Sequence, residues 1–125
     1  MAKQVGGFCM TAAALAVLMA ASAAHAEIPN NTVKLGVLTD LSGFASDSTG
    51  VGSVAAAKLA IEDFKKEKRD LKVELIQGDH QNKADIGSAL ARRWVDLEKV
   101  DAILDVPFSS VALAVQEVVR GSKTA

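Results

Sequence analysis

The sequence predicts an α/β fold, a doubly wound parallel sheet with the strand order 2-1-3. Between residues 33 and 121, three apolar runs of strand length alternate with amphipathic helical segments, which is typical of βαβ units. The second run alternates apolar and polar residues, as a strand near an edge does, whereas the third is almost wholly apolar. Right-handed crossovers then place the first strand between the other two.

The residues before this pattern, 1–26, are typical of a cleaved export signal. Lys3 provides the positive start, residues 8–21 form an apolar run broken only by Thr11, and small residues lead to a predicted cleavage between Ala26 and Glu27. The run is shorter than the roughly 20 apolar residues that span a bilayer. We therefore expect an exported mature protein of residues 27–125.

The composition of that mature part excludes several classes of function. Removing 26 of the 125 residues leaves 99, with no cysteine and one histidine, His80. Such a domain depends on a hydrophobic core rather than on disulfides, and its residues predict neither a metal site nor a cofactor. Without Lys3, 13 basic residues face 15 acidic ones, so nucleic acid is not an expected partner.

The first βα unit consists of a strand over 33–38, a long loop over 40–52 and a helix. That helix carries Val54, Ala57, Ile61 and Phe64 on one face, and the charged run 65–70 ends it in solvent. The second unit has its strand at 71–76, a polar loop over 78–83 and a second helix. This helix carries four apolar residues at near-helical spacing, Ile86, Leu90, Trp94 and Leu97, and we expect Trp94 to anchor the core.

The third unit begins with a strand over 102–106, which we expect to be buried on both faces. Residues 107–110 turn the chain into a helix that points Val111, Val115 and Val118 inward and ends at Gly121. The order 2-1-3 reverses between the first and third strands, so the carboxyl ends of these two strands should form a crevice.

Two loops meet at this predicted crevice, residues 42–50 and residues 108–110. Neither has the glycine pattern of a phosphate-binding loop. Ser109 and Ser110 stand where the third helix begins, so we expect one of them to cap it and both to bind a ligand carboxylate there. Phe108 is either a plug of the core or an apolar wall beside the ligand.

Catalysis by these serines is not expected. Hydrolysis would require a base, and the only histidine of the mature part, His80, follows the outer strand. No glycine-flanked nucleophile elbow surrounds Ser109 or Ser110. We therefore predict a binding protein rather than an enzyme.

Five segments, in this order and spacing, resemble the amino-terminal lobe of the type I periplasmic binding proteins that serve branched-chain amino acid ABC transporters. They are residues 33–43, Gly50, and residues 56–64, 79–85 and 101–107. The resemblance is strongest to the branch of this family that handles aromatic and other small organic carboxylates. It implies a protein in which two lobes close on a small-molecule ligand and are then recognised by a permease in the inner membrane.

The resemblance also implies roles for individual residues. A serine at the position of Ser109 holds the ligand carboxylate, Ser110 assists it, and the loop after the first strand contributes a side chain near Thr49. Phe108 stands where some relatives have a cysteine or a smaller polar residue, which favours a ligand more apolar than an amino acid. Because the family has a second lobe, residues 27–125 are expected to be an incomplete amino-terminal lobe, and we expect a monomer.

Two other functions remain open at this point. The periplasmic sensing domain of a receptor uses the same fold and would be followed by a transmembrane helix. An exported α/β hydrolase fragment is the second alternative, and it would depend on Ser109 or Ser110.

Overall fold

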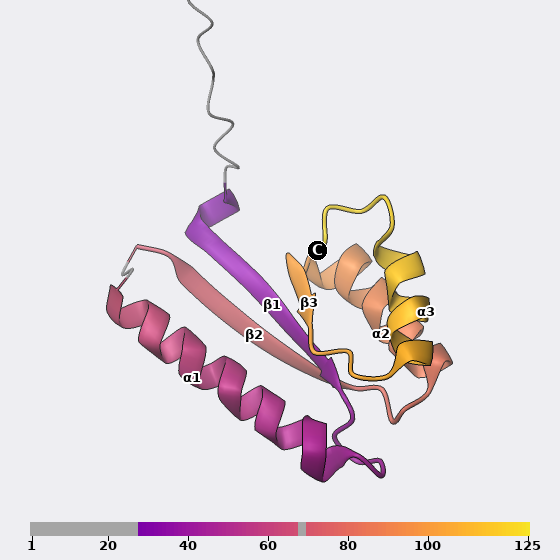
Figure 1. Cartoon of the computed structure of the whole chain (residues 1–125). Coiled ribbons are helices and arrows are strands. Elements are labelled where there is room, and N and C mark those ends of the chain that lie inside the picture. The colour runs from indigo at the N-terminus through magenta and orange to yellow at the C-terminus, as the bar shows by residue number, and fades with distance from the viewer. Residues whose placement is uncertain (1–27, 68–69) are drawn as a thin grey trace, which may run out of the picture.

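The computed structural model describes residues 28–67 and 70–125 (Figure 1). The predicted export signal and its cleavage site, Ala26 and Glu27, lie outside the described residues. None of the described helices has the length and hydrophobicity to cross a lipid bilayer. The elements are the 3-10 turn η1 (Pro29–Asn31), β1 (Thr32–Thr39), the helical turn η2 (Ser46–Gly50), α1 (Val51–Glu67), β2 (Lys72–Asp79), α2 (Ala84–Arg93), the helical turn η3 (Trp94–Glu98), β3 (Ala102–Leu104) and α3 (Ser109–Val119).

The three strands form a parallel sheet in the order β2-β1-β3, which confirms the predicted topology. β1 pairs with β2 from Thr32↔Lys72 to Thr39↔Asp79 and with β3 from Leu35↔Ala102 to Val37↔Leu104. Figure 1 shows α1 on one side of the sheet and the packed pair α2 and α3 on the other. This division follows from right-handed crossovers. The connection through α1 leads from β1 away from β3, whereas the connection through α2 leads from β2 back across β1 to β3, and α3 continues in that direction.

The main core lies between the sheet and the pair α2 and α3. Trp94 confirms the expectation of a core anchor, since only 4% of it is exposed. Its ring lies against Gly36 of β1 and Gly78 of β2, where an added Cβ would approach the ring to 2.5 Å and 2.9 Å. Two adjacent strands thus lack side chains where the indole needs the room. The buried members of this core are Leu38, Ala91, Trp94, Val100, Val111 and Val115.

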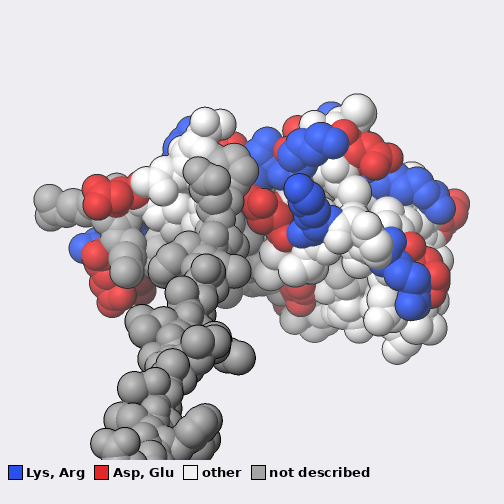
Figure 2. Space-filling model, turned by 90° about the horizontal axis from the view of Figure 1, so that it is seen from above, with Lys and Arg blue, Asp and Glu red and all other residues white. Residues whose placement is uncertain are grey.

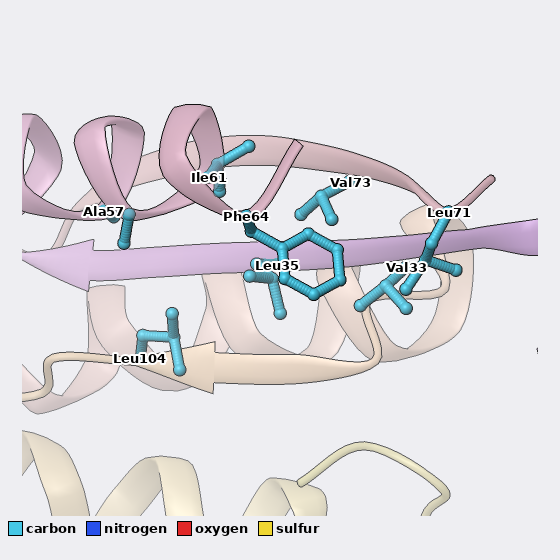
Figure 3. Close-up of a pocket in the computed structure, with 9 residues that line it drawn as sticks. Val33, Leu35, Ala57, Ile61, Phe64, Leu71, Val73 and Leu104 are labelled. Carbon is cyan, nitrogen blue, oxygen red and sulfur yellow. The ribbon is translucent and has the colours of Figure 1, made fainter. Parts of the chain in front are cut away.

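The opposite face of the sheet is covered only in part, by α1. Val54 and Ile61 of α1 are buried against it. Beside them an apolar hollow of about 310 Å³ remains open, and Figure 3 shows Leu104 of β3 on its far side from α1. All three residues of β3 are half-buried, so the expectation of a strand buried on both faces was wrong. The cause is that α1 lies over β1 and β2 and leaves β3 uncovered on that face.

A second expectation was also wrong, at the end of the second helix. Leu97 is 74% exposed and does not continue the apolar face of Leu90 and Trp94. The chain widens into a π-helical turn at η3, and the backbone of Lys99 is left-handed with φ 55°. A wider turn rotates the residues after Trp94 away from the core, so a regular 3.6-residue period no longer applies there.

Ion pairs between side chains contribute little to this architecture. Figure 2 shows basic and acidic side chains interspersed over the face seen from above. The ion pairs of the described residues are largely exposed, for example Asp63 with Lys66 at 2.8 Å and Glu117 with Arg120 at 2.8 Å. Exposed pairs of this kind contribute about 0–1 kcal/mol each.

Candidate functional site

The candidate site lies at the edge where all three parallel strands end. A titratable residue directly follows each strand: Asp40 follows β1, His80 follows β2 and Asp105 follows β3. Asp40 and His80 have no exposed surface, whereas Asp105 is exposed and has a left-handed backbone with φ 55°. In open α/β sheets, ligands bind at this edge where the strand order reverses, which here is between β1 and β3.

Buried Asp40 organises the loop after β1. Its carboxylate accepts hydrogen bonds from the amide of Gly43 at 2.7 Å and from the amide of Ala45 at 3.2 Å. An added Cβ at Gly43 would collide with that carboxylate, so a larger residue there would require the Asp40 side chain or the loop to move. Phe44 lies between the two donors and is 81% exposed.

Asp79, at the end of β2, ties the same loop to the neighbouring strand. It accepts hydrogen bonds from the amide of Leu41 at 3.0 Å, from the hydroxyl of Ser42 and from the amide of Gln81 at 3.0 Å. Burial is the largest single influence and raises the pKa of Asp79. The hydrogen bonds and the nearby His80 together outweigh it and leave the pKa below its usual value. Asp79 therefore stays ionised and holds the loop in place.

His80 is sealed beneath this edge. Its Nδ1 accepts a hydrogen bond from the amide of Asn82 at 2.9 Å, so the ring proton sits on Nε2, which has no partner among the described residues. Burial lowers the pKa of His80, and the charges of Asp40, Asp79 and Asp105 offset only part of that effect. The imidazole is thus neutral at pH 7. A sealed ring with its acceptor nitrogen occupied is poorly placed to serve as a base for Ser109 or Ser110.

At the start of α3 the structure corrects one prediction. The N-cap is Phe108, with extended φ −104° and ψ 127°, and no side chain caps the helix. Ser109 and Ser110 are its first two helical residues, so the expectation that one of them caps it was wrong. An N-cap residue has an extended backbone and directly precedes the helix. That position is occupied by Phe108, whose side chain has no hydrogen-bond acceptor. Since the first N–H groups of a helix have no partner within it, the first turn keeps free amide donors.

Three of the four predicted site residues, Phe108, Ser109 and Ser110, lie at this helix start. Ser109 and Ser110 are both exposed. Phe108 is half-buried: it packs against the core on one side, and its ring centroid lies 5.5 Å from that of Phe44 on the other. The packing against the core agrees with the expectation of a plug, and the role of an apolar wall beside a ligand stays a prediction. The contact with Phe44 brings the loop after β1 to the start of α3.

Thr49 lies in η2, further along the loop after β1. It is half-buried, and its hydroxyl donates to the carbonyl of Ala45 at 3.1 Å, which leaves only its oxygen lone pairs for another group. The sequence analysis did not predict that Asp40 organises the loop after β1 or that Phe44 contacts Phe108. The available signal was an Asp followed three residues later by Gly, with one aromatic residue inside an otherwise polar loop.

Other parts of the molecule offer less to a polar ligand. The hollow in Figure 3 is lined entirely by apolar residues from α1 and the three strands and their ends, so a carboxylate would find no donor there. Among the described residues, no group of three or more His, Cys, Asp or Glu side chains is placed to hold a metal ion. The carboxyl edge of the sheet remains the candidate site.

Comparison with known proteins now identifies the family. A family model described as "Periplasmic binding protein" matches residues 32–125. The chain belongs to this family. The family and its solved structures are substrate-binding proteins and not enzymes, which removes the hydrolase alternative. A comparison with curated protein sequences finds no match.

Solved periplasmic binding proteins have the same fold. A periplasmic binding protein from Burkholderia mallei is 36% identical with a TM-score of 0.70, over 76% of this chain and 25% of that one. A branched-chain amino acid ABC transporter ligand-binding protein from Burkholderia xenovorans is 48% identical with a TM-score of 0.65, over 70% and 24%. A solute-binding protein from Rhodopseudomonas palustris, in complex with 3,4-dihydroxybenzoic acid, is 27% identical with a TM-score of 0.65, over 71% and 24%.

These matches confirm the expected fold. The chain spans about a quarter of the length of each of these solved proteins. The resemblance to type I periplasmic binding proteins of ABC transporters is therefore established for one part of such a protein.

Proposed function

We propose that this chain is the amino-terminal part of the substrate-binding component of an ABC importer, and that it binds a small organic carboxylate or an amino acid in the periplasm. Residues 1–26 act as its export signal, with cleavage between Ala26 and Glu27. A permease in the inner membrane recognises the loaded protein, which acts as a monomer. Residues 27–125 form an incomplete amino-terminal lobe, and a second lobe completes the ligand site.

The observation that carries this proposal is the uncapped start of α3. Two exposed hydroxyls, those of Ser109 and Ser110, stand beside amide groups that no side chain caps. Free N–H groups at a helix start attract anions, because the helix dipole places positive charge there. Contact between Phe108 and Phe44 sets an apolar wall next to these donors. A carboxylate with an apolar body fits such a surface, with Thr49 as a further contact from the loop after β1.

Hydrogen bonds at the outer edge of β3 are consistent with a sheet that has a further strand there, as a larger lobe would. The amide of Ala125 donates to the carbonyl of Asp101 at 2.9 Å, and the amide of Ile103 donates to the carbonyl of Ala125 at 2.8 Å. This pair of bonds has the pattern of a parallel bridge. A residue at this place is where a further parallel strand beside β3 would begin.

Energetics explain why a second lobe is needed. A carboxylate at a helix start gains about 0.3 to 2 kcal/mol. Micromolar capture requires about 8 kcal/mol. The groups of this chain therefore supply a minor share of the affinity, and we expect the chain alone to bind its ligand weakly.

Two measurements test the proposal. Calorimetry with leucine, benzoate and coumarate should give dissociation constants well above the micromolar range, and a low micromolar value for any of them would contradict the weak-binding expectation. Amide NMR spectra during the same titrations should show shifts concentrated at Ser109, Ser110 and Val111. If no carboxylate moves these amides at millimolar concentration, the proposed site is wrong.

A further inference from the structure

Phe44 is 81% exposed, more than any other large apolar residue of the described chain, and it lies in a loop rather than on a helix. Single exposed apolar side chains such as Leu59 and Leu113, both on helices, are common on protein surfaces and need no explanation. Phe44 instead lies in a loop whose four neighbouring residues, 41–43 and 45, each donate a hydrogen bond to Asp40 or Asp79. The loop thus holds one aromatic ring out in solvent at a defined position.

The ring of Phe44 ends a row of three rings at the carboxyl edge. His80 is fully buried, and Phe108 meets it edge-on with centroids 5.6 Å apart and planes at 86°. Phe44 follows at 5.5 Å from Phe108 with its plane tilted by 56°. Both separations lie within the range of about 4.5–7 Å at which aromatic pairs attract one another. The row therefore runs from the protein interior to solvent and leaves surface of the outermost ring free.

The free ring lies close to the start of α3, since Phe108 directly precedes Ser109. A carboxylate bound by the first amides of α3 would have its body beside Phe108 and Phe44. A carboxyl group carried directly on a flat ring would bring that ring against theirs, whereas a puckered ring of the same size presents hydrogens in place of a π face.

We propose that Phe44, supported by Phe108, is a specificity-determining residue that selects carboxylates attached directly to an aromatic ring. This inference rests on the proposed function, because it takes the start of α3 as the place of the carboxylate. Asp40 acts as a positioning residue, since its two hydrogen bonds fix the amides on either side of Phe44. A ring that is already ordered loses little freedom when a ligand stacks on it, which favours binding.

The test compares benzoate with cyclohexanecarboxylate, two acids of the same charge and similar size. Both are titrated into the purified chain, and dissociation constants are taken from the amide shifts of Ser109 and Ser110. We expect benzoate to bind about two- to tenfold more tightly, as one aromatic contact predicts. In Phe44→Leu the preference for benzoate should disappear, so that the two dissociation constants become equal. Leu59→Ala, which removes a comparably exposed side chain on α1, should leave the ratio as it was.

The outcomes separate the two proposals. If both acids shift the Ser109 and Ser110 amides with equal constants, or if Phe44→Leu keeps the preference for benzoate, the inference about Phe44 is wrong and the proposed function stands. If neither acid shifts these amides, the proposed function fails and this inference falls with it. Asp40→Asn, which retains only one carbonyl oxygen as an acceptor, should reduce the preference without removing Phe44. An unchanged preference in this variant would contradict the positioning role of Asp40.

Discussion

Replacing Gly36 with alanine should destabilise the protein, although the same change usually stabilises a strand. An added Cβ would lie 2.5 Å and 2.6 Å from two carbons of the Trp94 ring, which is itself buried among the core residues. Overpacking of a core lowers the free energy of unfolding by about 1–3 kcal/mol. Replacing a flexible glycine with alanine raises it by about 0.5–1 kcal/mol. The difference spans about 0–2.5 kcal/mol, and we expect a net loss near the middle of that range, about 1 kcal/mol.

Gly52 provides a matched control for this prediction. It lies in the first turn of α1, and an added Cβ there meets nothing within 4 Å. Gly52→Ala should therefore raise the free energy of unfolding by about 0.5–1 kcal/mol. Urea denaturation of the two variants and the parent measures both effects. Because the free energy of unfolding falls by about 1–3 kcal/mol per molar urea, the two variants should shift the midpoint in opposite directions. Equal shifts in the same direction would show that the contact between Trp94 and Gly36 does not limit the packing.

Three further predictions concern the carboxyl edge. Ser109→Ala combined with Ser110→Ala should weaken benzoate binding severalfold in NMR titration without changing the urea midpoint, because both side chains are exposed and neither caps α3; a lowered midpoint would indicate a structural role instead. Because burial lowers the pKa of His80, the unfolded chain takes up a proton first as the pH falls below about 6.5, so stability should decline there and the decline should be smaller in His80→Gln. Asp105→Asn should strengthen carboxylate binding by about twofold at low salt and less at high salt, since Asp105 is exposed and its charge is screened.

The sheet topology could be predicted because it depends on patterns that the chain carries locally. The alternation in residues 71–76 marked β2 as an edge strand, and right-handed crossovers then left only one order. The burial of β3 was predicted wrongly because it depends on which layer covers the α1 face, and the local sequence of 102–104 does not encode that. Leu97 was misplaced for a related reason, since a π-helical turn changes the period on which the prediction relied.

The site could be predicted at the level of segments but not of single contacts. The reversal of strand order predicted its place, and Ser109 and Ser110 do lie at the start of α3, while ligand binding there stays a prediction. The cap was misassigned because one residue separates the last extended position from the first helical one, and propensity alone favours serine over Phe108. The roles of Asp40 and Phe44 depend on how a loop folds back on a buried carboxylate, which spacing suggests only weakly.

An edge with three aspartates would by charge alone repel an anion, and the hydrogen bonds resolve this conflict. Asp40 accepts two of them and Asp79 accepts three, and four of the five come from residues 41–45. Each donor turns the positive end of its dipole toward a carboxylate and so reduces the field that reaches a ligand. The loop that presents Phe44 therefore also offsets the negative charges of Asp40 and Asp79. Because Asp40 and Asp79 are already engaged, the ammonium group of an amino acid at this part of the site would have to pair with Asp105, the exposed aspartate of this edge.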